Sequence, residues 1–224
     1  MKKFLIIALA IIFALSAAAC GGGDSGGGGD SVSTSGGDSG GSAASGTDGL
    51  GDLLSATYAD LMKSKKYYMK FTSHMEFDGE VVEGRTEVAY NNDDYAMIGE
   101  SSFGGMTIKS RMITKGDVMY LIDDDAKTIT KTSVSISDDT DDSDFSDLNY
   151  LGKGTGTING RTLPYEEYEN YGAIVRFYFD GKDLYAIESI GEGFDSMVMI
   201  IEELSNKIPS GMFDIPSGYT TLEW

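Results

Sequence analysis

The most regular pattern in the chain is a strict alternation of apolar and polar residues in "YYMKFTSHMEF", residues 67–77. One side of this two-residue period carries Tyr67, Met69, Phe71, Met75 and Phe77. The other side carries Lys70, Thr72, His74 and Glu76. Alternation of this kind predicts a strand with one buried and one solvated face, as in an antiparallel sheet.

Turn-forming sequences then recur about every ten residues, as expected for consecutive hairpins. They include "FDGE" at 77–80, "YNNDD" at 90–94, "FGG" at 103–105, "KGD" at 115–117 and "DDDAK" at 123–127, and the pattern resumes after residue 150. We therefore predict a mainly β domain with a long antiparallel sheet of about ten or eleven strands. A sheet of this length tends to curl or close on itself, and no βαβ alternation supports a parallel sheet.

A single helix is predicted, at residues 50–66. Leu53, Leu54, Tyr58, Leu61 and Met62 fall there at helical spacing, and lysines gather near the C-terminal end. We expect this single helix to lie either inside the curve of the sheet or along its side.

The N-terminus has the pattern of a signal peptide at residues 1–19. Lys2 and Lys3 precede the apolar segment 4–15, and small residues follow up to Cys20. A membrane-spanning helix needs about 20 apolar residues, whereas glycines begin at Gly21. The alternatives are an ordinary secretory signal with a free cysteine, or an uncleaved anchor.

Residues 20–50 are predicted to be a disordered tether rich in Gly, Ser and Asp, because they lack the apolar area needed to fold. The folded domain then comprises residues 51–224. The small residues before Cys20 resemble a bacterial lipobox. This resemblance implies cleavage before Cys20, diacylglycerol on its thiol and further acylation such as palmitate. Two or more acyl chains give a stable membrane anchor.

The charge and composition exclude several classes of function. The chain holds 36 acidic and 17 Lys or Arg residues, a net charge of −19, which disfavours nucleic acid as a partner. It has one His and one Cys, whereas zinc sites need several N or S ligands and a nucleophile needs a positioned base. We expect a non-catalytic protein without a metal or other cofactor.

The helix leading into a strand-rich chain, the long meander and the ending "IPSGMFDIPSGY" resemble the lipoprotein-carrier superfamily that includes LolA, LolB, LppX and LprG. The resemblance covers residues 50–224. It implies a curved half-barrel with its helix on the concave side, where acyl chains bind, and no catalytic motif. It also implies a monomer, lipid-anchored on the extracytoplasmic face of a cell membrane, with the Gly-rich tether typical of Gram-positive surface lipoproteins.

Methionines mark the candidate ligand site. All ten beyond Met1 lie in the domain, eight on predicted strands, and this flexible side chain suits surfaces that repack around varied apolar ligands. The predicted ligand-binding residues, for a lipid or another hydrophobic ligand, are Met69, Phe71, Met75, Met97, Met112, Phe177, Phe179, Met197 and Met199. The alternative is that these side chains only fill an irregular β core.

Three further segments have a structural and a functional interpretation. The acidic loop 137–147 is either solvated or a Ca²⁺ site. In "YEEYENY", residues 165–171, the glutamates are either solvated or a glycosidase pair, and the tyrosines offer a platform for cell-wall glycans. His74 is expected to be exposed and idle. A structural surface lipoprotein that binds a partner protein is a further alternative.

Overall fold

The computed structural model describes residues 53–77, 80–134, 148–170, 172–191 and 194–223. Within these ranges the only helix is α2 (Leu54–Lys63), and it is too short to cross a bilayer. The predicted signal peptide, Cys20, the tether and the acidic loop 137–147 lie outside the described residues. They stay predictions.

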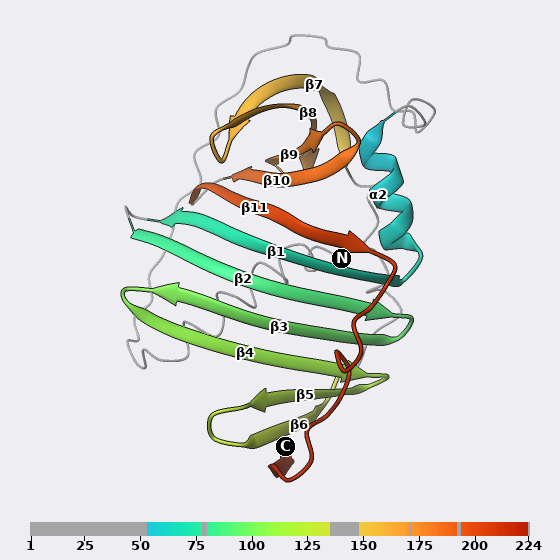
Figure 1. Cartoon of the computed structure of the whole chain (residues 1–224), viewed down its shortest axis with the longest axis vertical. Coiled ribbons are helices and arrows are strands. Elements are labelled where there is room, and N and C mark those ends of the chain that lie inside the picture. The colour runs from blue at the N-terminus through green and yellow to red at the C-terminus, as the bar shows by residue number, and fades with distance from the viewer. Residues whose placement is uncertain (1–52, 78–79, 135–147, 171, 192–193, 224) are drawn as a thin grey trace, which may run out of the picture.

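In the described part of the chain, twelve strands form one open, curved sheet (Figure 1). The first meander consists of β1 (Lys66–Phe77), β2 (Glu80–Asn91), β3 (Asp94–Phe103), β4 (Met106–Lys115), β5 (Val118–Asp123) and β6 (Thr128–Ser133). The second consists of β7 (Asn149–Ile158), β8 (Arg161–Asn170), β9 (Ala173–Asp180), β10 (Asp183–Gly191) and β11 (Phe194–Ser205). The last strand is β12 (Thr220–Glu223).

The two meanders join where β1 pairs with β11, so the strand order is β12-β6-β5-β4-β3-β2-β1-β11-β10-β9-β8-β7. The mainly β class and the long antiparallel sheet are confirmed. The count of ten or eleven strands was one or two too low. The unforeseen strand is β12, which has only four residues and runs parallel to β6. No alternation can show in so short a segment.

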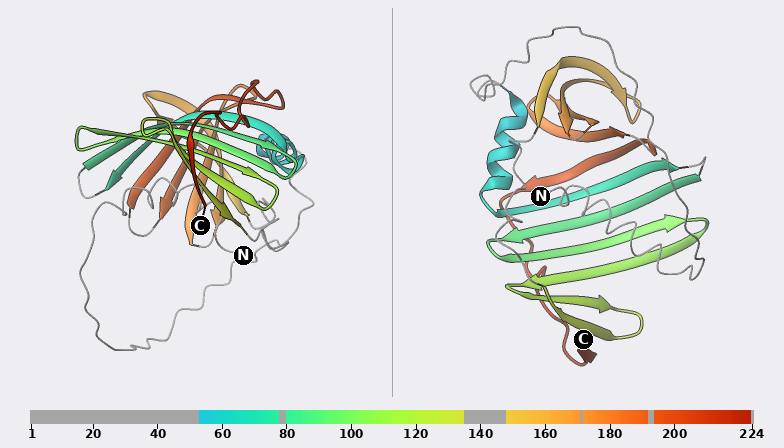
Figure 2. Two further views of the ribbon diagram at one scale, coloured as in Figure 1. Left: turned by 90° about the horizontal axis from the view of Figure 1, so that it is seen from below. Right: turned by 180° about the vertical axis from the view of Figure 1, so that it is seen from behind.

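The two faces of the sheet are covered by different segments. We call the "helix face" the one that carries Met69, Phe71 and Met199, since α2 packs on this side. The "tail face" carries Tyr68, Ala89 and Ile113, and the C-terminal segment 206–219 packs on it through Met212. Figure 2 shows the sheet as an arch with α2 on its concave side and the C-terminal segment over its convex side. The predicted position of the helix is therefore confirmed.

Glycines in β7 let the sheet pack closely against two tyrosines of the tail face. A Cβ on Gly154 would lie 2.5 Å from Cζ of Tyr165, and one on Gly156 would lie 2.9 Å from the Tyr178 hydroxyl. Gly152 lies at a shift of the β7–β8 register. These glycines thus serve packing and a bulge, as their strand pattern predicts.

Candidate functional site

The structure brings all nine predicted ligand-binding residues onto the helix face. Across the strands, Met69 is paired with Val88, Val88 with Met97, and Met97 with Met112. Leu204 and Leu121 extend this row at its two ends. Six strands spaced by about 4.8 Å give an apolar row about 24 Å long. A hydrocarbon chain laid across the strands would meet apolar side chains over this whole length.

The remaining predicted residues continue this surface toward α2. Met75 is paired with Met197, and Met199 contacts both the cluster around Phe71 and the cluster around Phe177. Phe179 lies beneath Tyr58 of α2, with their ring centroids 6.2 Å apart. The methionine-rich strands and the surface under the helix are therefore continuous.

Most of these side chains are well packed. Phe179 is only 1% exposed and Met97 3%, whereas Met69 and Met199 are partly buried. Such packing agrees with a core and equally with a soft surface whose side chains rearrange around a ligand.

The helix face of β1–β4 carries no charged residue at any position from Tyr67 to Met75, Val82 to Tyr90, Tyr95 to Ser101 and Ile108 to Thr114. The charges of these strands alternate onto the tail face instead. They are Lys70, His74, Glu83, Arg85, Glu87, Glu100, Lys109 and Arg111. The chain holds 36 acidic and 17 Lys or Arg residues, yet this separation leaves these parts of one face without any charge.

A row of three tyrosines borders the apolar row. The rings of Tyr67 and Tyr90 stack at 5.0 Å between centroids, and Tyr90 and Tyr95 lie 4.7 Å apart. Burial raises the pKa of Tyr90 to about 12 and raises the pKa values of Tyr67 and Tyr95 well above the usual range. The tyrosines stay neutral, so this border is also uncharged.

Sequence reasoning missed Val88, Tyr90, Tyr95 and Met119, which belong to the same cluster as Met97 and Met112. The signal was present in the chain: the two-residue period that assigned Met69 and Phe71 also holds in residues 82–90 and 95–101. The prediction covered only methionine and phenylalanine.

Helix α2 is held on the sheet by a carboxylate from a distant strand. Oε1 of Glu166 accepts a hydrogen bond from the Leu54 amide at 3.0 Å, and Oε2 accepts one from the Ser55 amide at 3.0 Å. Glu166 is 3% exposed, and Nζ of Lys153 lies 3.5 Å from Oε1. Two free N–H groups at the start of the helix thereby find an acceptor.

Two hydroxyl contacts add to this attachment. Ser55 and Tyr168 share a hydrogen bond between their hydroxyls, and the Tyr58 hydroxyl donates to the Lys182 carbonyl at 2.9 Å. The Leu184 amide donates to the same Tyr58 oxygen. Glu166 was expected to be solvated like its neighbours in the sequence; this is wrong, because it is buried and its two oxygens hold α2.

The other members of "YEEYENY" are also placed. Oε2 of Glu167 accepts a hydrogen bond from Nε of Arg176 at 2.7 Å. Oε1 of Glu169 accepts one from the Gly172 amide, also at 2.7 Å. Tyr165 faces the tail side and Tyr168 the helix side, while Tyr171 lies outside the described residues. Tyr165 and Tyr168 do not form a common platform.

His74 is exposed as expected, and its Nδ1 lies 3.6 Å from a carboxylate oxygen of Glu83. No group of three metal-ligating side chains occurs in the part of the chain that the structure describes.

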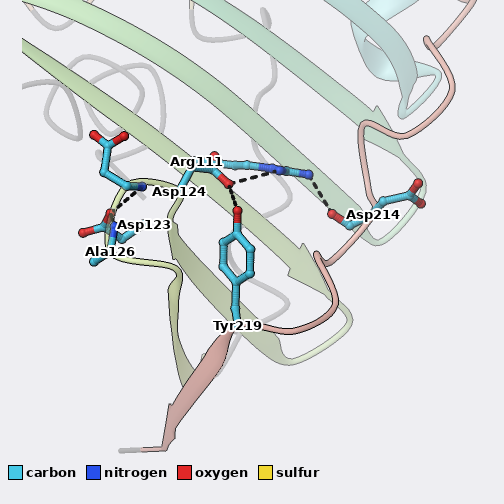
Figure 3. A network of polar contacts seen from close by, with 7 residues as sticks. Arg111, Asp123, Asp124, Ala126, Asp214 and Tyr219 are labelled. Carbon is cyan, nitrogen blue, oxygen red and sulfur yellow. Dashed lines mark hydrogen bonds and ion pairs between the residues drawn. The ribbon is translucent and has the colours of Figure 1, made fainter.

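The tail face holds the C-terminal segment through a polar network (Figure 3). Nη2 of Arg111 donates to the Asp214 carbonyl at 2.7 Å, and Nη1 lies 3.6 Å from the Asp124 carboxylate. The Tyr219 hydroxyl donates to the same carboxylate at 2.9 Å.

A groove of about 1390 Å³ runs over β1–β6 and β11 beside this network. Its lining includes charged tail-face residues such as Arg85 and Glu100, and also Met97, Gly99 and Ser110.

No family model and no curated protein matches the sequence. Several solved structures are similar in fold. An uncharacterized conserved protein from Thermus thermophilus has 9% identity and a TM-score of 0.43 over 76% of this chain and 99% of that one. MucB in the MucA/MucB complex of Pseudomonas aeruginosa has 10% identity and a TM-score of 0.41, over 76% of this chain and 63% of that one.

A LolA superfamily protein from Nitrosomonas europaea is similar with 8% identity and a TM-score of 0.32, over 71% of this chain and 97% of that one. This superfamily is the group that the sequence resembles. At such identities and TM-scores, neither membership of the superfamily nor any function follows from the likeness.

Proposed function

We propose that this protein is a non-catalytic, extracytoplasmic lipoprotein that binds a lipid or another hydrophobic ligand on its helix face. The observation that carries the proposal is the uncharged row across six neighbouring strands, Leu204, Met69, Val88, Met97, Met112 and Leu121. The row has about the length of a long acyl chain. Methionine and valine offer an acyl chain dispersion contacts but no polar group.

In this proposal the protein is a monomer anchored by diacylglycerol on Cys20, and residues 20–50 separate the domain from the membrane. A permanent anchor limits such a carrier to ligands that it meets within the reach of its tether. Residues 20–50 can extend over about 100 Å at most, so the ligand would come from the same membrane or the adjoining wall.

The proposal predicts that the full chain purified from a bacterial host carries lipid, detected by mass spectrometry of an organic extract. Mass spectrometry of the intact protein tests the acylation and cleavage at Cys20 in the same sample. The double variant M69S/M199S places hydroxyls on the two partly buried methionines, and thermal unfolding checks that it folds. We expect it to lose most of the bound lipid and to weaken binding of a fluorescent fatty acid by about tenfold, since two apolar contacts are lost.

The matched control is M106S, because Met106 is 63% exposed at the tip of the β3–β4 hairpin. It should bind lipid as the parent does. A lipid-free extract together with no binding of the fluorescent probe would leave the methionines as core residues and support the structural alternative.

A further inference from the structure

One hairpin of the sheet has a turn unlike the others. Among the six hairpins that the structure describes completely, five have Asn, Asp or Lys in the turn and a charged residue in the pair that flanks it. The β3–β4 hairpin instead has Gly104 and Gly105 in its turn, flanked by Phe103 and Met106. Residues 101–108 contain no charge at all. Surface turns are normally polar, so this composition indicates surroundings other than water.

Apolar side chains near this turn are exposed. Met106 is 63% exposed and Ile108 36%, and Val81, at the same end of β2, is 45% exposed. A Cβ on Gly104 or Gly105 would meet no atom of the described residues within 4 Å. The tip therefore projects from the sheet, at the edge opposite α2 (Figure 1).

The exposed tip continues the helix face. Met106 and Ile108 lie on the same side of β4 as Met112, because an even number of residues separates them along the strand. At the same end of the sheet, Met75 is paired with Met197. A lipid that leaves the predicted binding surface at this end would therefore meet apolar side chains as far as the tip of the hairpin.

The size of this exposed surface favours a lipid bilayer over a protein as its partner. Three exposed side chains cover far less than the roughly 1,000 Å² that a specific protein interface buries. A few apolar side chains are enough for a shallow contact with a bilayer when a tether keeps the domain close. The uncharged tip also suits this contact, because anionic headgroups would repel the 36 acidic residues of the chain.

We infer that the tip of the β3–β4 hairpin inserts into the surface of a lipid bilayer, and that the hydrophobic ligand passes there between the bilayer and the helix face. This inference rests on the proposed function, which brings the domain close to a membrane. In this position Met106 and Ile108 contact the bilayer, and an entering ligand reaches Met75 and Met197 next.

Tryptophan fluorescence tests the contact with the bilayer. The full chain is added to an excess of phosphatidylcholine vesicles, and Met106→Trp is compared with Asp93→Trp, in the β2–β3 turn at the opposite end of the same strands. The single natural tryptophan, Trp224, is replaced by Phe in both. With phosphatidylcholine brominated on its acyl chains near the headgroup, we expect emission from position 106 to fall about twofold and emission from position 93 to change little.

The variant Met106→Asp tests the passage of the ligand. A carboxylate is costly to place in a bilayer, so we expect a fluorescent fatty acid to move from vesicles to this variant about tenfold more slowly than to the parent. Its affinity for the same fatty acid at equilibrium should be unchanged. The control Met106→Leu keeps an apolar side chain and should behave as the parent does, and thermal unfolding checks that both variants fold.

Three results would contradict this inference. Equal quenching at positions 106 and 93, or transfer to Met106→Asp at the parental rate, would overturn it while the proposed function stands. Emission from position 106 that changes with protein concentration rather than with lipid would mean that a second copy covers the hairpin, and would also overturn it. If the parent bound no fluorescent fatty acid, the proposed function and the passage of a ligand would both be wrong.

Discussion

The two faces of β1–β4 are made from alternating residues of the same four strands, yet they differ in nearly every physical respect. On the helix face, methionine, tyrosine, serine and glycine occupy residues 67–75, 82–90, 95–101 and 108–114 without a charged side chain. On the tail face, Lys70 and Glu87 pair at 3.1 Å, and Arg85 and Glu202 pair at 2.7 Å. A shift of one residue along a strand thus separates an uncharged surface from a charged one that contacts water and the C-terminal segment.

The largest expected effect is on the helix face, where burial dominates stability. Phe179→Ala removes a ring that is 1% exposed beneath α2. We expect it to lower the free energy of unfolding by about 3–5 kcal/mol, because the lost contacts leave a cavity. Urea denaturation measures this loss. A loss under about 1 kcal/mol would mean that the helix face collapses around the gap and is softer than its packing indicates.

A smaller effect should appear at alkaline pH, again from the helix face. Burial raises the pKa of Tyr90 to about 12, so the folded state keeps its proton after the unfolded chain has lost it. The stabilisation is complete below about pH 10 and is lost as pH rises toward 12. Between pH 9 and 11 we expect Tyr90→Phe to lose about 1 kcal/mol less stability than the parent. The measurement is the free energy of unfolding at several pH values. If it fell equally with pH in Tyr90→Phe and in the parent, the raised pKa of Tyr90 would be contradicted.

The smallest effect should come from the tail face at acidic pH. Partial burial opposes ionisation of Glu87, but hydrogen bonds from Lys70 and Tyr68 prevail and lower its pKa. Its stabilisation is therefore present above the ordinary carboxyl pKa of about 4 and is lost as pH falls below it. Glu87→Gln should cost at most about 1 kcal/mol at pH 7 and flatten the acid limb of the stability curve. An unchanged acid limb would contradict this assignment.

The sheet could be predicted largely from the sequence because alternation and turns are local signals. The period of two in residues 67–77 places Met69 and Phe71 on one face and Lys70 and His74 on the other, and the structure agrees. The same alternation brought the nine predicted residues together before any contact was known. Local patterns carry this information since a strand's geometry fixes which side chains share a face.

What could not be predicted depends on contacts between distant segments. Glu166 lies 112 residues from the helix amide to which it is bonded, and nothing in "YEEYENY" distinguishes it from its solvated neighbours. Likewise, Met212 lies outside the strands, and no local pattern predicts that it packs into the tail-face cluster at 4% exposure.

The pairing of β1 with β11, which joins the two meanders, has a consequence for the rate of folding. Tyr68 is aligned with Ser205 across this pair, so the two meanders meet only through residues far apart in the chain. Each meander can form from successive local hairpins, but closing so long a loop is entropically unfavourable and slow. Pairing of the two meanders through β1 and β11 should therefore be the last and rate-limiting step of folding. Two fragments produced by a cut between β6 and β7 should be able to reassemble through the same pairing.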